Sequence, residues 1–363
     1  MNFRDQKMNR LVYLILSVSL AWTLSAQQIY VGTHSKNESK GLYSSQLNQD
    51  GTLKETKGLL LELGTTVVIQ KKGSSLIYSC GVGEKKQHGL IQCFDTQTGK
   101  LIDTVSSSDS RPCYLALSKD QSTIYVSNIK DGSVCAISLK KDGSFAELIS
   151  KVIIEPAGKR FAPHACVVSP EGEYLFVPDI AGNRLCRLKI DQVSGKLKYL
   201  DSIQSELFQG PRHMTFDPEG KRAYMVNQMG EAITVFTYGK GILKILGNVR
   251  TVPDDQLDIN NHIAEIKLHP SGKYVYASNR GHNSLVLFQR DLATGLLNFD
   301  RCFSSGGEAP WSFAISAKGD FLYCSNNKSN NLVTYKIDPA NGHLKPIGKP
   351  VSVPNPASVI VVD

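Results

Sequence analysis

The stretch HPSGKYVYASN, residues 269–279, combines a Gly-containing turn with a short strand that has an aromatic residue near its centre. Similar phrases recur along the chain, and their aromatic positions are Tyr78, Tyr125, Phe176, Tyr224, Tyr276 and Tyr323. These positions are 47, 51, 48, 52 and 47 residues apart. Counting back one more interval reaches Tyr30 in IYVGT, so the chain carries seven copies of one unit. A fixed period of this length is the sequence signature of a repeat architecture.

Each copy contains four strand signals in the same order. A strand often opened by proline, such as PRHMTFD at 211–217, precedes the turn and the aromatic strand. A polar loop, a third alternating strand such as NLVTYKI at 331–337, and a turn into a fourth strand follow. Alternation without helical periodicity indicates an all-β chain. We predict a seven-bladed β-propeller with four antiparallel strands per blade, against the alternatives of an open solenoid or two β-sandwiches.

The two ends of the repeat region complement one another. PASVIVVD at 356–363 looks like a first strand with nothing after it, and QIYVGT at 28–33 looks like a second strand with nothing before it. Pairing them would complete one blade and remove the free sheet edges. We therefore predict a single domain over residues 27–363, closed as a ring by its N- and C-terminal strands.

Residues 1–26 have a different character. Arg4, Lys7 and Arg10 precede an apolar run of 14 residues, LVYLILSVSLAWTL, and Ala26 offers a small residue for cleavage. This pattern is typical of a secretory signal peptide and is short for a membrane span. The alternatives are an uncleaved anchor or a buried helix. We predict export to the periplasm or the medium, with no membrane span after signal removal.

The remaining composition excludes several classes of function. The chain has a net charge of +8 with its basic residues scattered, which argues against nucleic-acid binding. There is no nucleotide-binding fingerprint and no metal-ligand spacing, so we expect no cofactor and no metal. We also expect a monomer. None of the eight cysteines forms a CxxC pair, and most lie in apolar strand-like runs. We expect mostly buried thiols, with Cys80 and Cys93 as the first candidate disulfide.

Candidate functional residues follow from the blade geometry. The first strand of each blade lines the central channel, so the residues that begin these strands converge at its mouth. Three positions carry ionisable groups, His164, Arg212 and Glu265, and this convergence favours a ligand site over a purely structural channel. Arg280 and His282 lie on a loop of the Glu265 blade, and their reach to the mouth is left open. The other predicted mouth positions are Thr65, Thr66, Cys113, Tyr114, His213, Trp311, Ser312, Ala357 and Ser358.

Several of these segments resemble one known family. The stretches YVGTHSKNESKGLYSSQLNQDGTL at 30–53, PHACVVSPEGEYLFVPD at 163–179, GPRHMTFDPEGKRAYMVN at 210–227 and SNRGHNSLVLF at 278–288 are similar to the seven-bladed lactonases typified by bacterial 6-phosphogluconolactonase of the propeller type. The resemblance covers nearly all of the chain after residue 26. It implies a carbohydrate-metabolism hydrolase that opens a six-membered sugar lactone to the acid.

The resemblance also implies roles for individual residues. His164 and Glu265 fall at positions associated with catalysis, and either could be the base that activates water. Arg212 falls at a binding position, where it could stabilise the oxyanion or clamp a phosphate. We also count Arg212 among the catalytic candidates. The expected substrate contacts are His213, Arg280, His282 and Trp311, and the expected partner is a small lactone or sugar acid.

Three departures from the family pattern count against a phosphorylated substrate. Cys166 stands where the family has a second histidine, on the face that strict alternation would give His164. Trp311 stands where the family has arginine, and the signal peptide predicts export although phosphorylated sugars belong to the cytoplasm. Two alternatives therefore stay open: a muconate or muconolactone cyclase on the same scaffold, and a propeller that binds a ligand or protein without catalysis.

Overall fold

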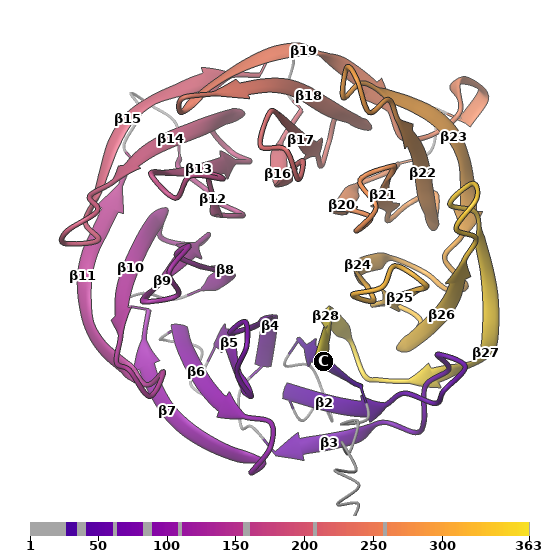
Figure 1. Cartoon of the computed structure of the whole chain (residues 1–363), viewed down its shortest axis with the longest axis horizontal. Helices are drawn as coiled ribbons and strands as arrows, with labels where there is room; N and C mark the ends of the chain where they lie inside the picture. The colour runs from indigo at the N-terminus through magenta and orange to yellow at the C-terminus, as the bar shows by residue number, and fades with distance from the viewer. Residues whose placement is uncertain are drawn as a thin grey trace, which may run out of the picture.

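The computed structural model describes residues 27–34, 41–60, 64–82, 89–107, 111–154, 160–205, 209–256 and 260–362. Figure 1 shows seven sheets arranged in a ring around a central channel, each with four antiparallel strands. The predicted seven-bladed β-propeller is thus confirmed. The predicted signal peptide, residues 1–26, lies outside the described residues.

The strands of each blade follow one another from the channel outwards. The only helix within the described ranges is the 3₁₀ turn η1(Asp254–Gln256). In order from the innermost strand, the sheets are β28(Pro356–Val362), β1(Gln28–Thr33), β2(Gly41–Gln46), β3(Lys57–Leu60); β4(Gly64–Gln70), β5(Leu76–Val82), β6(Gly89–Asp95), β7(Lys100–Ser106); β8(Pro112–Leu117), β9(Thr123–Asn128), β10(Ser133–Leu139), β11(Phe145–Ile153); β12(Val167–Val168), β13(Tyr174–Asp179), β14(Arg184–Ile190), β15(Leu197–Gln204); β16(Pro211–Phe216), β17(Arg222–Asn227), β18(Ala232–Gly239), β19(Ile242–Arg250); β20(Ile263–Leu268), β21(Tyr274–Asn279), β22(Ser284–Arg290), β23(Leu297–Ser304); and β24(Pro310–Ile315), β25(Phe321–Asn326), β26(Asn331–Ile337), β27(Leu344–Ser352).

The ring closes where the two ends of the chain meet. Strand β28 pairs antiparallel with β1, and Val31 lies opposite Val359. The C-terminal strand therefore supplies the innermost strand of the blade that β1 to β3 begin. This pairing confirms the closure predicted from the sequence and gives β1 a partner on both of its edges.

In several blades the aromatic residue of the repeat bonds the blade to the next one. The Tyr276 hydroxyl donates a hydrogen bond of 2.6 Å to the carbonyl of Gly342, in the β26–β27 turn of the following blade. Tyr224 makes the equivalent bond to Gly295 at 2.7 Å, and Tyr78 makes it to Gly143 at 2.8 Å. Because a buried carbonyl needs a donor, this contact explains why an aromatic residue with a hydroxyl recurs.

The asparagine that ends the repeat phrase holds the segment that leads from the outer strand of one blade to the innermost strand of the next. Asn279 is fully buried and donates 2.9 Å to the carbonyl of Thr251, just after the outer strand of the preceding blade. Asn326 donates 2.8 Å to the carbonyl of Ser305 in the same manner. These bonds hold the segment that carries the chain from the rim back to the innermost strand, and so they position the residues at the channel mouth.

The turn glycine of the repeat has a conformational role. Gly272 has φ +72°, in the left-handed region that most residues avoid. In the copy SKDQSTIYVSN at 118–128, glutamine stands at this place and Gln121 takes a φ of 59°. The glycine therefore recurs because the turn requires a positive φ.

The hydrophobic core lies between neighbouring blades. One cluster, for example, joins Val226 and Val235 of the fifth blade to Ile266, Val275 and Val286 of the sixth. Six of the eight cysteines are buried and two are half-buried, which confirms the expectation of mostly buried thiols.

The candidate disulfide between Cys80 and Cys93 is wrong, since both residues are free thiols. Cys80 lies opposite Ile91 and Cys93 lies opposite Tyr78. The two cysteines are therefore diagonal neighbours, about 7–8 Å apart, which is too far for a disulfide.

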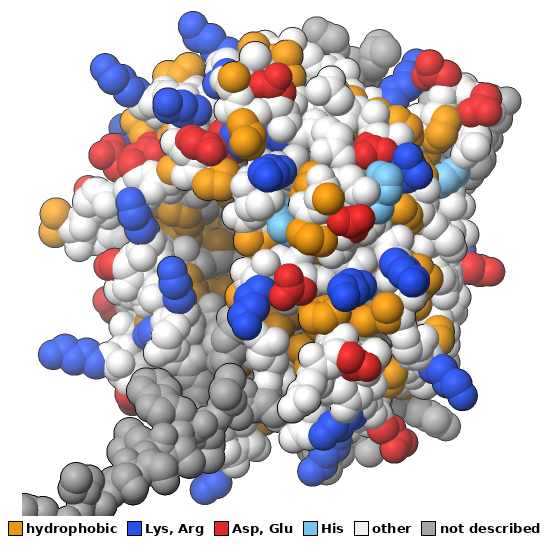
Figure 2. Space-filling view, turned by 45° about the vertical axis from the view of Figure 1, so that its right-hand side comes forward, with side chains coloured by type: hydrophobic (Ala, Val, Ile, Leu, Met, Phe, Trp, Pro, Cys, Tyr) orange, Lys and Arg blue, Asp and Glu red, His pale blue; other side chains and the backbone are white. Residues whose placement is uncertain are grey.

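The charged side chains do not gather into one patch on the face seen in Figure 2. Lysine and arginine alternate there with aspartate and glutamate. No helix of the described ranges has the length and apolarity needed to cross a bilayer.

Candidate active site

A backbone irregularity near the start of the innermost strands brings pairs of consecutive residues to the channel. In β16 the register with β17 shifts between Pro211 and His213. Equivalent shifts occur at the starts of β4, β8, β20 and β24. An extra residue interrupts the alternation of side chains between the two faces of a strand. Arg212 and His213 therefore both line the same cavity.

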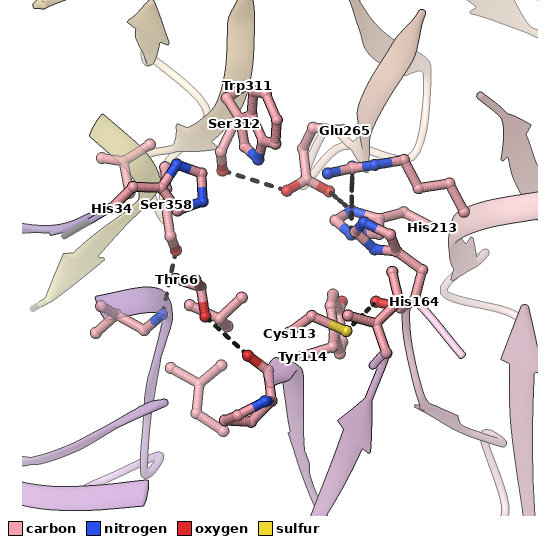
Figure 3. A pocket seen from close by; sticks show the side chains of 18 of the residues that line it. His34, Thr66, Cys113, Tyr114, His164, His213, Glu265, Trp311, Ser312 and Ser358 are labelled. Carbon is pink, nitrogen blue, oxygen red and sulfur yellow. Dashed lines mark hydrogen bonds and ion pairs between the residues drawn. The ribbon is translucent and has the colours of Figure 1, made fainter. Parts of the chain in front are cut away.

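This cavity has a volume of about 260 Å³ and contains most of the predicted mouth residues. Figure 3 shows them converging from blades far apart in the sequence. Those predicted and present in the lining are Thr66, Cys113, Tyr114, His164, Arg212, His213, Glu265, Trp311, Ser312, Ala357 and Ser358. Thr65 is buried and is not part of the lining.

Sequence reasoning missed His34, Arg111 and Lys267, which also line the cavity. Arg111 directly precedes the proline that opens β8, and Lys267 lies two residues beyond Glu265. Strand periodicity could have found Lys267, because residues i and i+2 share a face. His34 follows the second strand of its blade, and nothing in the repeat singled it out.

Glu265 is the most fully bonded side chain of the site. It is 8% exposed. Its Oε1 lies 3.1 Å from Nδ1 of His213 and accepts a 3.1 Å bond from the backbone N–H of Ile266, while Oε2 accepts a 3.2 Å bond from the Ser312 hydroxyl. Burial raises the pKa of this carboxyl, but Lys267, His213 and Arg212 outweigh it and lower the pKa to about 2. Glu265 is therefore an anion at neutral pH.

His213 is neutral and has a defined tautomer. Burial and then the charge of Arg212 lower its pKa to about 4. An ionised carboxylate can only accept hydrogen bonds, so the ring carries its proton on Nδ1, facing Glu265. Nη1 of Arg212 lies 3.4 Å from Nδ1 and 3.3 Å from Nε2 of His213. These nearly equal distances place the guanidinium over the ring face, so the in-plane lone pair on Nε2 stays available.

Arg212 is a buried cation next to this pair. It is 1% exposed, and its Nη1 donates a short hydrogen bond to the carbonyl of Ala264. Burial lowers its pKa to about 10, which still leaves it protonated at neutral pH. Its Nε, fully enclosed, has no hydrogen-bond partner among the described residues.

His164 lies beside His213, and the two ring centroids are 5.2 Å apart in an edge-to-face arrangement. Burial lowers the pKa of His164 well below its usual 6.5, and the charges of Arg212 and Arg280 act in the same direction. The ring is therefore neutral, and its buried Nδ1 has no hydrogen-bond partner within the described part of the chain. The sequence prediction that His164, Arg212 and Glu265 meet around one axis is confirmed in geometry.

Cys166 does not share the face of His164, contrary to strict alternation. Pro163 pairs with Asp179 and Val167 pairs with Phe176, so the inner strand contains one more residue than its partner. The extra residue turns Cys166 into the core between blades, where it is fully buried. The site therefore contains no thiol at this position.

Arg280 and His282, both on the SNRGH loop, lie at different distances from the cavity. Arg280 contacts Trp311, with its guanidinium 4.4 Å from the centre of the indole ring. His282 does not line the cavity; its Nδ1 lies 2.7 Å from the Ser284 hydroxyl, and its Nε2 contacts the amide of Gln256. The structure thus brings Arg280 to the edge of the site and leaves His282 outside it.

The charged residues of the lining indicate which class of substrate the cavity can bind. Three cationic side chains, Arg111, Arg212 and Lys267, line it against the one carboxylate of Glu265. Among the described residues, no group of three or more His, Cys, Asp and Glu side chains could hold a metal ion. The arrangement offers a base, a buried cation and an excess of positive charge, which suits a substrate that develops negative charge.

Comparisons with known proteins agree with this architecture. A periplasmic gluconolactonase of Pseudomonas aeruginosa is similar in structure, with a TM-score of 0.85 and 26% identity over 93% of this chain and 99% of that one. A putative 6-phosphogluconolactonase of Bacteroides fragilis has a TM-score of 0.82 and 25% identity over 94% of this chain and 99% of its own. An uncharacterised protein of Staphylococcus aureus (strain USA300) is 28% identical over 302 residues, covering 79% of this chain and 86% of that protein.

The family model described as "Lactonase, 7-bladed beta-propeller" matches residues 28–361. The match covers every blade and every ionisable residue of the cavity. This chain is therefore a member of the seven-bladed β-propeller lactonase family.

Proposed function

We propose that this protein hydrolyses a sugar lactone to the open-chain acid in the central cavity, with His213 as the base. The observation that carries the proposal is the pairing of the ionised Glu265 with Nδ1 of His213, 3.1 Å away, beside the buried cation Arg212. A carboxylate that fixes one imidazole nitrogen as donor leaves the other as a proton acceptor. Family membership and the gluconolactonase name of the Pseudomonas neighbour support the substrate class.

Glu265 is a poor candidate for the base itself. Both of its oxygens already accept hydrogen bonds, and its pKa of about 2 makes the carboxylate a weak proton acceptor. His213 is the stronger base of the two and is unprotonated at neutral pH. Glu265 is accordingly a positioning residue that holds the His213 tautomer.

The reaction uses one water molecule and needs no other reactant. Nε2 of His213 takes a proton from water while the water oxygen attacks the lactone carbonyl. The guanidinium of Arg212 stabilises the oxyanion that forms. The bond from the carbonyl carbon to the ring oxygen then breaks, the ring oxygen takes the proton back from His213, and the product is a hydroxy acid. His164 lines the same cavity beside His213, where its neutral ring can contact the substrate.

Export of the protein belongs to the same proposal. The leader-like residues 1–26 would direct the chain out of the cytoplasm, where unphosphorylated sugar lactones would be the available substrates. Cell fractionation and N-terminal sequencing of the native protein test this step. A chain that stays cytoplasmic with Met1 retained would contradict it.

The activity is tested on purified protein with D-glucono-1,5-lactone, following acid release with a pH indicator. We expect hydrolysis above the spontaneous rate, and a loss of about 10²–10⁴-fold in kcat/KM for His213→Gln, the range for a missing general base. His343→Gln is the matched control, because that histidine lies outside the cavity and faces Asp300. Equal rates for wild type, His213→Gln and the uncatalysed reaction would reject the proposal.

A further inference from the structure

We propose that Trp311 is the surface on which the sugar ring of the lactone packs, and that Arg280 is a positioning residue that holds this indole. The inference rests on the proposed function and adds the substrate class to it, an unphosphorylated, hydroxylated six-membered ring.

Trp311 forms part of the cavity wall without filling the channel. It sits at the irregular start of β24 and is half-buried. Figure 3 shows its indole beside Ser312 and Glu265, at the edge of the ring of polar side chains. The Arg212 guanidinium lies 5.9 Å from the centre of this ring, so a lactone held at Arg212 and His213 would lie against the indole.

Two neighbours hold the indole in place. The Arg280 guanidinium lies 4.4 Å from the ring centre, within the range of a cation–π contact. The His34 ring packs edge-to-face at 5.3 Å, with an interplanar angle of 88°. A rigid aromatic ring loses little conformational entropy when a ligand binds, so this support prepares the wall for contact.

Arg280 lies beside the indole and outside the cavity lining. Its Nε donates 3.2 Å to the carbonyl of His262, and the residue is not part of the cavity lining. Of these two side chains in contact, Trp311 lines the cavity and Arg280 does not. A phosphate at this position would contact an apolar ring and would have no cation to pair with there. Such a contact is unfavourable for a dianion.

Two cations of the cavity lining act on the carboxylate of Glu265. Arg212 donates to the carbonyl of Ala264 and lies beside the ionised Glu265. Lys267 shares a strand face with Glu265 and is the largest of the charges that keep this carboxyl ionised. The C–H face of a neutral sugar ring suits an exposed aromatic surface better than a phosphate does.

The chain offers a direct optical test, because it has two tryptophans, Trp22 in the leader-like segment and Trp311. In a Trp22→Phe background, all tryptophan emission comes from the cavity wall. The probes are D-glucono-1,5-lactam, a hydrolytically stable analogue of the lactone, and 6-phosphogluconate. We expect the lactam to change the emission with saturation, and 6-phosphogluconate to bind at least tenfold more weakly.

Variants separate the two roles. Trp311→Phe keeps an aromatic surface and should raise KM for gluconolactone less than threefold, whereas Trp311→Ala should raise it about tenfold with a smaller effect on kcat. Arg280→Met should shift the emission maximum of Trp311 and raise KM. Trp311→Arg should weaken the lactone and tighten 6-phosphogluconate.

The outcomes distinguish this inference from the proposed hydrolysis. Hydrolysis with unchanged emission and an unchanged KM in Trp311→Ala would overturn the packing surface alone. Saturable emission changes without hydrolysis would overturn the catalytic proposal and leave the packing surface standing. Tighter binding of 6-phosphogluconate than of the lactam would overturn the substrate class.

Discussion

Replacing Glu265 by glutamine changes one atom of the cavity and removes its one negative charge. The variant keeps the shape of the side chain, so the Ser312 hydroxyl and the Ile266 N–H can still be satisfied. The amide can present either an acceptor or a donor to Nδ1 of His213. The His213 tautomer is then no longer fixed, and Nε2 is not held as the proton acceptor.

The magnitude follows from the electrostatics of the site. The carboxyl of Glu265 has its pKa lowered from 4.5 to about 2 although it is buried, which corresponds to about 3 kcal/mol in favour of the ionised form. Loss of tautomer control in a base should lower kcat/KM by about 10²–10³-fold, or about 3–4 kcal/mol, with little change in KM.

Stability gives a second, independent readout. A carboxyl whose pKa is depressed in the folded state stabilises the fold above its unfolded pKa of 4.5, and this contribution disappears as the pH falls through about 2. Glu265→Gln should therefore lower the free energy of unfolding at pH 7 by up to about 3 kcal/mol and lack the corresponding loss between pH 4.5 and 2.

The kinetic constants and the free energy of unfolding can be measured on the same protein samples. Hydrolysis of D-glucono-1,5-lactone gives kcat and KM, and urea unfolding followed by circular dichroism at pH 7 and pH 3 gives the stability difference. A kcat/KM within threefold of wild type in a folded variant would refute the reasoning, because Glu265 would then not control the base. Reduced activity with a raised KM and unchanged kcat would assign Glu265 to binding alone.

Four further predictions follow from the same contacts. The kcat/KM of the wild type should be level from pH 7 to about pH 5 and fall as the pH drops through about 4, because His213 with its pKa near 4 is then protonated; a profile that falls already near pH 6.5 would point to an unperturbed histidine. Arg212→Met should lower kcat by about 10²–10³-fold through loss of oxyanion stabilisation, while a change in KM alone would limit Arg212 to binding. Tyr276→Phe should lower the free energy of unfolding by about 1 kcal/mol, measured by urea titration, since the carbonyl of Gly342 loses its donor; Phe176 shows that the repeat tolerates phenylalanine, so the variant should fold. The thiol of Cys113 should resist alkylation by iodoacetamide at pH 7, because burial raises its pKa; fast labelling with loss of activity would show a reactive thiol in the cavity.

The sequence determined the ring. The spacing of Tyr78, Tyr224 and Tyr276 predicted the blades because each of these tyrosines bonds a turn carbonyl of the next blade, a contact that recurs with the repeat. The complementary strands at the two ends predicted the closure for the same reason, since hydrogen-bonding edges need partners. The convergence of His164, Arg212 and Glu265 followed once the ring was known.

The roles within the cavity depended on the tertiary structure. Sequence periodicity placed Cys166 on the face of His164, whereas one extra residue in the inner strand turns that thiol into the core. The sequence also proposed both His213 and His282 as substrate contacts. In the structure His213 contacts Glu265, whereas His282 contacts Gln256. The His213 and Ser312 bonds to Glu265 come from other blades, and distances between blades are fixed by packing around the ring. The sequence repeat predicts where each side chain lies within its own blade. Its contacts with side chains of other blades, which determine its role, are known only from the tertiary structure.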